Sequence, residues 1–451
     1  MDGGSERFEQ LIRTAEAARA RHGIPGMAVG VIEGPRSWTR GLGRARVDAD
    51  AAVDSSTRFQ LASVTKTFTC AAIMRLVEQG QLSLDTRVRE LLPELKLADE
   101  GAAARVTIGQ LLGHLGGFEG DLYVDTGDDE LALARALARM VELRQLVEPG
   151  QLWSYCNAGY TALARVLERR TGLTAERALE LLVLEPLGLR ETSFASPALT
   201  QLPHARGHFT SKGVSRVAEP FPIPRAGLVV MGLATTIGDL LRWQRSWLEA
   251  SLLERATIER VWTSCGQGTG QMHFEGALAW QTTHIAGEQV VGAGGVALGQ
   301  NARMVSIPAR GLGLALLSND MRGAFAHREL VDTWLREHLG EGLPQPEPLA
   351  LPRAQLEACA GEYERRGAQL RVEAEGSGLR IHVRHPQGFP DERLPAPPPS
   401  RAQLFVPYAA DKTVLRAAVF DGPRAGELAE FHRDASGRVR WARLAMRLHQ
   451  R

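Results

Sequence analysis

The residues best suited to chemistry in this chain are a serine and a lysine three positions apart, Ser63 and Lys66. Apolar side chains recur at helical spacing over residues 63–80, and side chains three apart meet on one face of a helix. A serine hydroxyl becomes a good nucleophile when a neighbouring base removes its proton. A lysine can be that base if burial lowers its pKa toward neutrality. The pair therefore predicts a nucleophilic serine at a helix N-terminus, whose free N–H groups suit a developing oxyanion.

A second candidate is the tripeptide Tyr155-Cys156-Asn157, on a loop that leads into a predicted helix. Tyr155 could share the proton transfer with Lys66, because a cationic neighbour lowers the pKa of a phenol. Asn157 offers a donor and an acceptor that could orient Lys66 or a substrate amide. Alone, the tripeptide is more typical of a helix cap beside a half-buried tyrosine than of a catalytic group. Cys156 has no evident base partner, so we interpret it as a packing residue.

Together these motifs resemble the serine β-lactamase and penicillin-binding-protein superfamily. The most similar branch holds class C β-lactamases, the β-lactamase-like carboxylesterases and the D-amino-acid-specific peptidases. The resemblance spans residues 23–319 and includes the segments 107–118 and 184–189. In that family a third motif, Lys or His followed by a small residue and Gly, lies on the strand that edges the site and precedes an Ile-Pro pair.

The third motif departs from the family pattern. Counting back from Ile307-Pro308 places Ala293-Gly294-Gly295 at this motif. Gly295 matches the final glycine, but Ala293 stands where the resemblance implies a cation. That cation normally helps to bind a substrate carboxylate, so its absence counts against β-lactams and carboxylate-bearing peptides and suits esters or blocked substrates.

Two basic residues on neighbouring predicted strands, His284 and Arg303, could replace the missing charge, and the sequence leaves this open.

The resemblance also implies roles for the site residues. Lys66, with Tyr155, would take the proton from Ser63, which would attack a carbonyl and form an acyl-enzyme. The backbone N–H groups of Ser63 and Val296 would form the oxyanion hole. Tyr155 would then pass a proton to the leaving group. The residues expected to bind or orient the substrate are Asn157, Gly295, Val296 and Ala293. No metal and no cofactor are expected.

The elements that must position these residues begin and end the first part of the chain. A helix over 8–22 precedes strands at 27–32 and 37–41, and a block of helices follows. The helices after the Ser63 helix are predicted at 85–95, 107–115, 130–143, 158–170 and 175–184. Strands return at 277–285, 289–291, 303–307 and 313–317, before a helix at 324–339. This order predicts an α/β (α+β) domain over residues 1–340, with an antiparallel sheet flanked by helices plus a helical subdomain.

A proline-rich linker at 341–353 separates this part from a different pattern. Short strands with Gly, Asp and Pro turns between them are predicted at 369–374, 378–384, 404–406, 414–420, 427–432 and 439–444. They predict a small all-β barrel over residues 354–451. This barrel resembles, more loosely, the lipocalin-like domain attached to some of these hydrolases.

Composition narrows the partners. The 451 residues carry 53 Lys+Arg against 52 Asp+Glu, a formal net charge of +1, so no bulk attraction to nucleic acid or an anionic membrane is expected. The four cysteines are scattered without a Cys-x-x-Cys pair, which argues against a zinc site or disulfide framework and suits a reducing compartment. We find neither an export signal nor a membrane span in the sequence, and expect a cytoplasmic protein.

We favour an acyl hydrolase that cleaves an ester or amide, including D-amino-acid peptides, through an acyl-enzyme on Ser63. The substrate would be a small molecule or peptide. An acyltransferase or peptide cyclase of the same fold, which resolves the acyl-enzyme with an amine or alcohol, is the second reading. A non-catalytic binding protein on a decayed scaffold is the third, and Ala293 supports it. Assembly into a homo-oligomer is left open.

Overall fold

The computed structural model describes residues 3–451 except 123, 196–198, 200, 212, 219–222, 267–273, 298, 387–400 and 422–424. Its centre is a seven-stranded antiparallel sheet with the order β2-β1-β12-β11-β10-β9-β8. The strands are β1 (Gly26–Glu33), β2 (Arg36–Gly43), β8 (Glu275–Gly276), β9 (Gln281–Ile285), β10 (Glu288–Ala297), β11 (Gln300–Ile307) and β12 (Leu312–Ser318). The N-terminal hairpin therefore joins the late strands, as the sequence predicts, through the pairing of β1 with β12.

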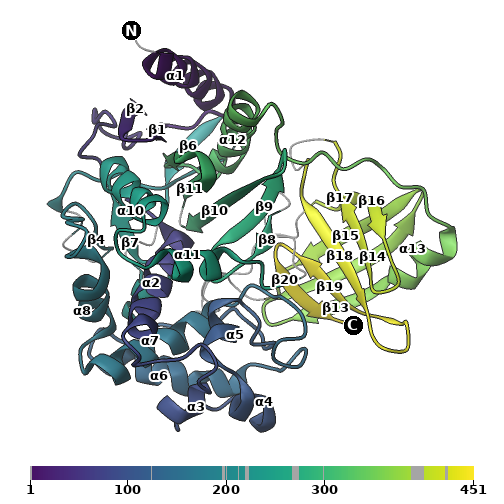
Figure 1. Cartoon of the computed structure of the whole chain (residues 1–451). Coiled ribbons are helices and arrows are strands. Elements are labelled where there is room, and N and C mark those ends of the chain that lie inside the picture. The colour runs from purple at the N-terminus through teal and green to yellow at the C-terminus, as the bar shows by residue number, and fades with distance from the viewer. Residues whose placement is uncertain are drawn as a thin grey trace.

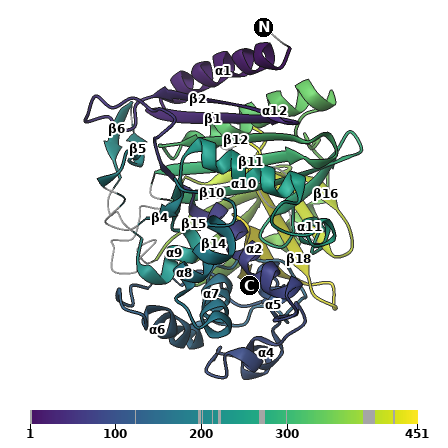
Figure 2. The same cartoon turned by 60° about the vertical axis from the view of Figure 1, so that its left-hand side comes forward.

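Helices cover both faces of this sheet. Figure 2 shows α1 (Gly3–His22) and α12 (Gly323–Leu339) on one face, and α10 (Ile237–Glu249) and α2 (Thr65–Glu78) on the other. Each face has its own apolar core, because successive side chains of a strand point to opposite sides. The α2 face holds the larger core, which continues into the helical block.

The helical block surrounds α2, whose residues from Thr65 to Met74 are all buried. Its other helices are α3 (Val88–Leu91), α4 (Glu100–Arg105), α5 (Ile108–Leu112), α6 (Ala132–Ala138), α7 (Asn157–Thr171), α8 (Ala175–Leu179), α9 (Leu228–Met231) and α11 (Arg255–Trp262). The smaller strands are β3 (Phe59–Gln60), β4 (Ser193–Phe194) and β7 (Leu233–Thr235), which form one sheet, and β5 (His208–Ser211) with β6 (Val214–Val217), which form a hairpin.

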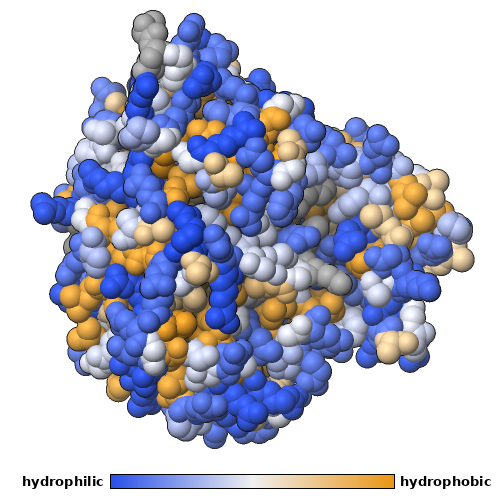
Figure 3. All heavy atoms as spheres, viewed as in Figure 1, coloured by the Kyte–Doolittle hydropathy of each residue, from blue (hydrophilic) through white to orange (hydrophobic). Residues whose placement is uncertain are grey.

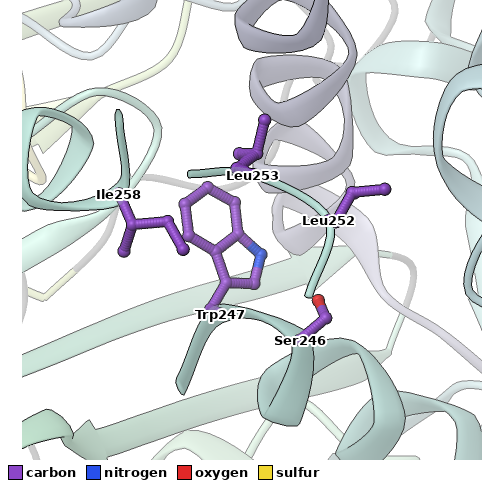
Figure 4. Close-up of a pocket in the computed structure, with 5 residues that line it drawn as sticks. All are labelled: Ser246, Trp247, Leu252, Leu253 and Ile258. Carbon is purple, nitrogen blue, oxygen red and sulfur yellow. The ribbon is translucent and has the colours of Figure 1, made fainter. Parts of the chain in front are cut away.

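An aromatic cluster packs between α2 and α10. Phe68 on α2 stacks on Trp243 of α10 with ring centroids 3.9 Å apart, and Trp243 meets Trp247 edge-on. Figure 4 shows the Trp247 indole between Leu253 and Ile258, beside a small hollow. This hollow has no room for a water molecule. The cluster is therefore a packed support and offers no ligand space.

The C-terminal part is a closed eight-stranded barrel that lies beside the β8–β9 edge of the sheet (Figure 1). A short helix, α13 (Arg353–Cys359), precedes it. Its strands are β13 (Gly361–Arg365), β14 (Ala368–Glu375), β15 (Gly378–Arg384), β16 (Gln403–Ala410), β17 (Val414–Ala418), β18 (Leu428–Arg433), β19 (Val439–Leu444) and β20 (Arg447–Gln450). The predicted barrel is confirmed, but the sequence analysis missed β13 and β20, the two strands that close it.

Several predicted elements differ in extent from the observed ones, and two of the differences have a clear local cause. The helix expected at 85–95 is helical only in α3, and Pro93 accounts for its end, because a residue before proline is driven out of the helical region. The strand expected at 277–285 is extended only in β9, because residues 277–280 form the turn that joins β8 to β9. Ala279, with φ +64°, makes the turn between them.

The barrel packs against the first part through an apolar contact. Trp441 and Leu448 of the barrel meet Leu146 and Val147, and the Trp441 indole N–H donates to the Leu146 carbonyl at 3.0 Å. Figure 3 shows polar and apolar side chains interspersed over one face of both parts. Among the described residues, no helix combines the length and the apolar character that crossing a bilayer requires.

Candidate active site

Ser63 lies in a tight 3₁₀ turn, Ala62–Val64, immediately before α2. The prediction of one helix from residue 63 is therefore wrong at its start, although Lys66 does fall in the first turn of α2. Ala62 has a left-handed backbone, φ +47°, which an alanine adopts only when its surroundings hold it there. The turn presents the Ser63 hydroxyl to Lys66, whose Nζ donates to Ser63 Oγ at 3.2 Å.

Lys66 is buried, with 1% of its surface exposed. Its Nζ also donates to the Val230 carbonyl at 3.1 Å. Burial lowers the pKa of Lys66 to about 7; the positive charge of Arg447 adds to this effect, and the carboxylate of Asp121 opposes it. Lys66 is thus neutral in a large fraction of molecules at neutral pH, as a general base must be.

Tyr155 lies beside Lys66, with the Lys66 Nζ 5.1 Å from the centre of its ring. His114 packs against the same ring at 4.4 Å between centroids, and its Nδ1 accepts a hydrogen bond from the Cys156 N–H at 3.1 Å. His114 itself has φ +58°, another left-handed non-glycine residue at the site. It packs against the tyrosine and binds the backbone of the tripeptide.

The phenol of Tyr155 is a proton donor at neutral pH. Burial raises the pKa of Tyr155 to about 12, although the Ser63 hydroxyl and the charge of Arg447 act in the opposite direction. The sequence argument expected a cationic neighbour to lower this pKa. Burial outweighs the cation, so the phenol keeps its proton at neutral pH.

Asn157 begins α7 at the edge of the site. Its side-chain N–H donates to Asp121 Oδ1 at 3.1 Å. Cys156 caps the same helix, because its Sγ accepts from the Gly159 N–H at 3.2 Å. Burial raises the pKa of the Cys156 thiol to about 12, so no thiolate is available there for attack at neutral pH.

The third-motif strand β10 passes directly against the Ser63 turn. A Cβ built on Gly295 would lie 2.1 Å from the Leu61 carbonyl oxygen and 2.8 Å from the Ser63 backbone nitrogen, so only glycine fits here. Ala293, two residues earlier on the same strand face, is buried in the core that surrounds α2. Val296 follows at the open edge, with 41% of its surface exposed.

Neither of the two basic residues considered as replacements reaches this face. Arg303 pairs with Gly294 and lies under it, on the face opposite to that of Gly295. Its guanidinium reaches Gln281 at 3.5 Å. His284 is exposed and pairs with Gln289, toward the far end of β9.

The barrel contributes a cation that lies beside Tyr155. Arg447, the first residue of β20, has its guanidinium carbon 5.1 Å from the centre of the Tyr155 ring. The preceding residue, Met446, accepts the Tyr155 backbone N–H at 2.9 Å. Neither residue is among those that the sequence predicts for the site. The one available signal was the short Arg447–Gln450 strand pattern after the last predicted strand, and it does not reveal which part of the chain it meets.

A comparison with known families matches residues 9–335 to the Beta-lactamase family model. The chain belongs to the Beta-lactamase family. It is 31% identical over 384 residues to penicillin-binding protein 4 of Amycolatopsis lactamdurans, covering 80% of this chain and 97% of the relative. It is also 31% identical over 264 residues to esterase EstB of Burkholderia gladioli, covering 50% and 66% respectively.

Among solved structures, SurE is similar over the full length of both chains, with a TM-score of 0.78 and 22% identity, and a second structure of it contains D-Leu. This likeness shows that the two-part fold, barrel included, is shared. The family membership and the relatives make this chain a serine hydrolase of the β-lactamase fold.

Proposed function

We propose that this serine hydrolase cleaves an ester or amide through a covalent acyl-enzyme on Ser63. One observation carries the proposal: a buried lysine with a pKa of about 7 donates to the serine hydroxyl at 3.2 Å. This is the arrangement that a serine nucleophile with an adjacent base requires. A non-catalytic scaffold would have no reason to keep a lysine buried against a hydroxyl.

The proposed reaction has two stages. Neutral Lys66 takes the Ser63 proton while Oγ bonds to the substrate carbonyl carbon, and the resulting oxyanion accepts hydrogen bonds from the N–H groups of Ser63 and Val296. As the tetrahedral intermediate collapses, the bond to the leaving group breaks. Tyr155 gives that group its proton and regains one from the Lys66 ammonium. Water then attacks the acyl carbon, and the acid leaves as Ser63 regains its proton.

The other site residues support this assignment. Asn157 borders the site from the start of α7 and offers its amide to the acyl part of a substrate. Gly295 lets β10 approach the Ser63 turn, which brings the Val296 N–H toward the oxyanion position. Ala293 supplies no charge, so substrate recognition falls to other groups.

Hydrolysis is tested with p-nitrophenyl esters of N-blocked D- and L-amino acids. We expect steady release of nitrophenol by the wild type and loss of release in Ser63→Ala and Lys66→Gln. Equal rates for the wild type and Ser63→Ala would contradict the proposal.

Acyl transfer to an amine is the second candidate, and the position of Arg447 favours it. The group that protonates a leaving group also deprotonates an incoming acceptor, by microscopic reversibility. Arg447 places a positive charge against the Tyr155 ring, and its Nε and Nη2 donate to Asp121. It suits an acceptor that carries a carboxylate, and SurE has been solved with D-Leu.

The two outcomes separate in a product assay. The acyl-enzyme is formed with an activated ester in the presence of D-leucine, D-leucinamide or no amine. Amide product with D-leucine that exceeds that with D-leucinamide, and that declines in Arg447→Gln, supports transfer. Free acid alone under all three conditions supports hydrolysis.

A further inference from the structure

Asp121 is a buried carboxylate that gathers donors from both parts of the chain. It accepts from the Asn157 side chain at 3.1 Å, from Arg365 at 3.0 Å and from Arg447 Nη2 at 3.0 Å, and Arg447 Nε forms a second bond to it. The two arginines outweigh the effect of burial and lower the pKa of Asp121 to about 2. The carboxylate is therefore ionised at neutral pH.

Two of the donors belong to the strands that close the barrel. Arg365 ends β13 and Arg447 begins β20, and these neighbouring strands pair where the barrel closes. Asn157 belongs to the candidate active site. A single carboxylate thus connects the site tripeptide to both closing strands of the barrel.

The turn between β19 and β20 needs such support. Its two residues, Ala445 and Met446, have φ +48° and +67°, the left-handed conformation that glycine or asparagine ordinarily provides. The described residues include seven non-glycine residues with positive φ. Two of them form this turn, and two more, Ala62 and His114, border Ser63 and Tyr155. Strain held by the surrounding structure is typical of functional sites.

The turn is also bonded to the tripeptide segment directly. The Met446 carbonyl accepts the Tyr155 N–H at 2.9 Å, and the Leu448 N–H donates to Ser154 Oγ at 3.1 Å. A displacement of the turn would therefore move Tyr155. The bonds from Arg447 to Asp121 oppose that displacement.

We propose that Asp121 is a positioning residue that holds the β19–β20 turn of the barrel against Tyr155 and Asn157, which makes the barrel a working part of the active site. The proposal rests on the function assigned above to Ser63, Lys66 and Tyr155. Asp121 also sets the local charge. Besides burial, the charged groups that act on the pKa of Lys66 are Arg447, which disfavours its protonated form, and Asp121, which favours it; the Cys156 thiol is uncharged at neutral pH.

The test compares Asp121→Asn with a matched control, Glu119→Gln. Glu119 lies two residues earlier, is equally buried, and accepts from Arg144 and from the Arg366 N–H of the barrel. It bonds neither Asn157 nor Arg447. Acylation of Ser63 by an alkyl ester, whose leaving group needs a proton from Tyr155, should slow about 10- to 100-fold in Asp121→Asn, as expected for misplaced reacting groups, and less than about 3-fold in the control.

A second readout is independent of activity. The chain has four lysines, so NMR of lysine-labelled protein can follow the titration of Lys66. We expect the pKa of Lys66 to decrease in Asp121→Asn, to increase in Arg447→Gln and to stay unchanged in Glu119→Gln. If Asp121→Asn fails to fold, Asp121→Asn with Arg447→Gln removes the opposed charges together and is compared with Arg447→Gln alone.

The outcomes separate the two proposals. Equal slowing in Asp121→Asn and Glu119→Gln, or an unchanged Lys66 pKa in Asp121→Asn, would overturn the positioning role and leave Asp121 as one of several interface residues. Opposite pKa changes in a protein that forms no acyl-enzyme would uphold the positioning role and refute the function proposed for Ser63.

Discussion

The rate of Ser63 acylation should decrease toward low pH as Lys66 becomes protonated. Replacing Arg447 by glutamine should move this acid limb of the pH–rate profile to higher pH. In the wild type, a Lys66 pKa of about 7 means that about half of the molecules hold a neutral base at pH 7. A lysine with an ordinary pKa would be neutral in only about one molecule in 3000 at that pH. Arg447 contributes to the lowering of this pKa. Its removal should therefore raise the pKa of Lys66 part of the way toward the ordinary value of a lysine.

The change in the wild-type acylation rate with pH follows from the same pKa of Lys66. The neutral fraction of Lys66 decreases about 50-fold between pH 7 and pH 5 and increases about 2-fold above pH 8.5. The acylation rate should follow these changes. Stopped-flow release of p-nitrophenol is the appropriate assay, because this leaving group departs without a proton and does not depend on Tyr155. At each pH below the plateau, Arg447→Gln should be slower than the wild type.

Arg451→Gln is the matched control. Arg451 lies on the same barrel edge, loses the same charge on substitution, and donates only to carbonyls of the segment before β13, those of Ala358 and Ala360. Its acid limb should coincide with that of the wild type. A flat wild-type profile from pH 5 to pH 8, or a limb that moves to lower pH in Arg447→Gln, would refute the assignment of Lys66 as the base.

Three further substitutions test separate parts of the account. Tyr155→Phe should slow cleavage of alkyl esters at least about 100-fold but p-nitrophenyl esters less than about 10-fold, because only the former need a proton donor; equal losses would contradict this role. Gly295→Ala should reduce the acylation rate about 100- to 1000-fold by forcing β10 away from the Ser63 turn, the loss expected for one oxyanion-hole donor, and a rate within a few-fold of wild type would show that β10 is not part of the site. Trp441→Ala should lower the free energy of unfolding by about 3 kcal/mol in urea titrations, since it empties a buried contact between the two parts; a loss below about 1 kcal/mol would mean that this contact does not hold the barrel.

The site residues that could be predicted from the sequence are those that lie close together along the chain. Ser63 and Lys66 are three apart, and the helix that follows was evident from its apolar spacing. The sheet was predicted because alternating apolar residues mark each strand. The boundary errors arise where one residue adopts an unexpected backbone, as Ala279 does between β8 and β9.

The cation of the site could not be found in this way. Arg447 and Asp121 are 326 residues apart, and their contact depends on how the barrel docks on the first part. No periodic pattern encodes such docking. The sequence did show that no cation stands at Ala293. The two residues considered as replacements, His284 and Arg303, lie elsewhere on the sheet, and the cation beside Tyr155 belongs to the barrel.

The central claim is a covalent acyl-enzyme on Ser63, and intact mass measurement after mixing with an activated ester tests it most directly. The account predicts a single acyl adduct on the wild type, mapped by peptide digestion to the fragment that contains Ser63, and no adduct on Ser63→Ala. An adduct on Ser63→Ala, or none on a folded wild type with several esters, would contradict it.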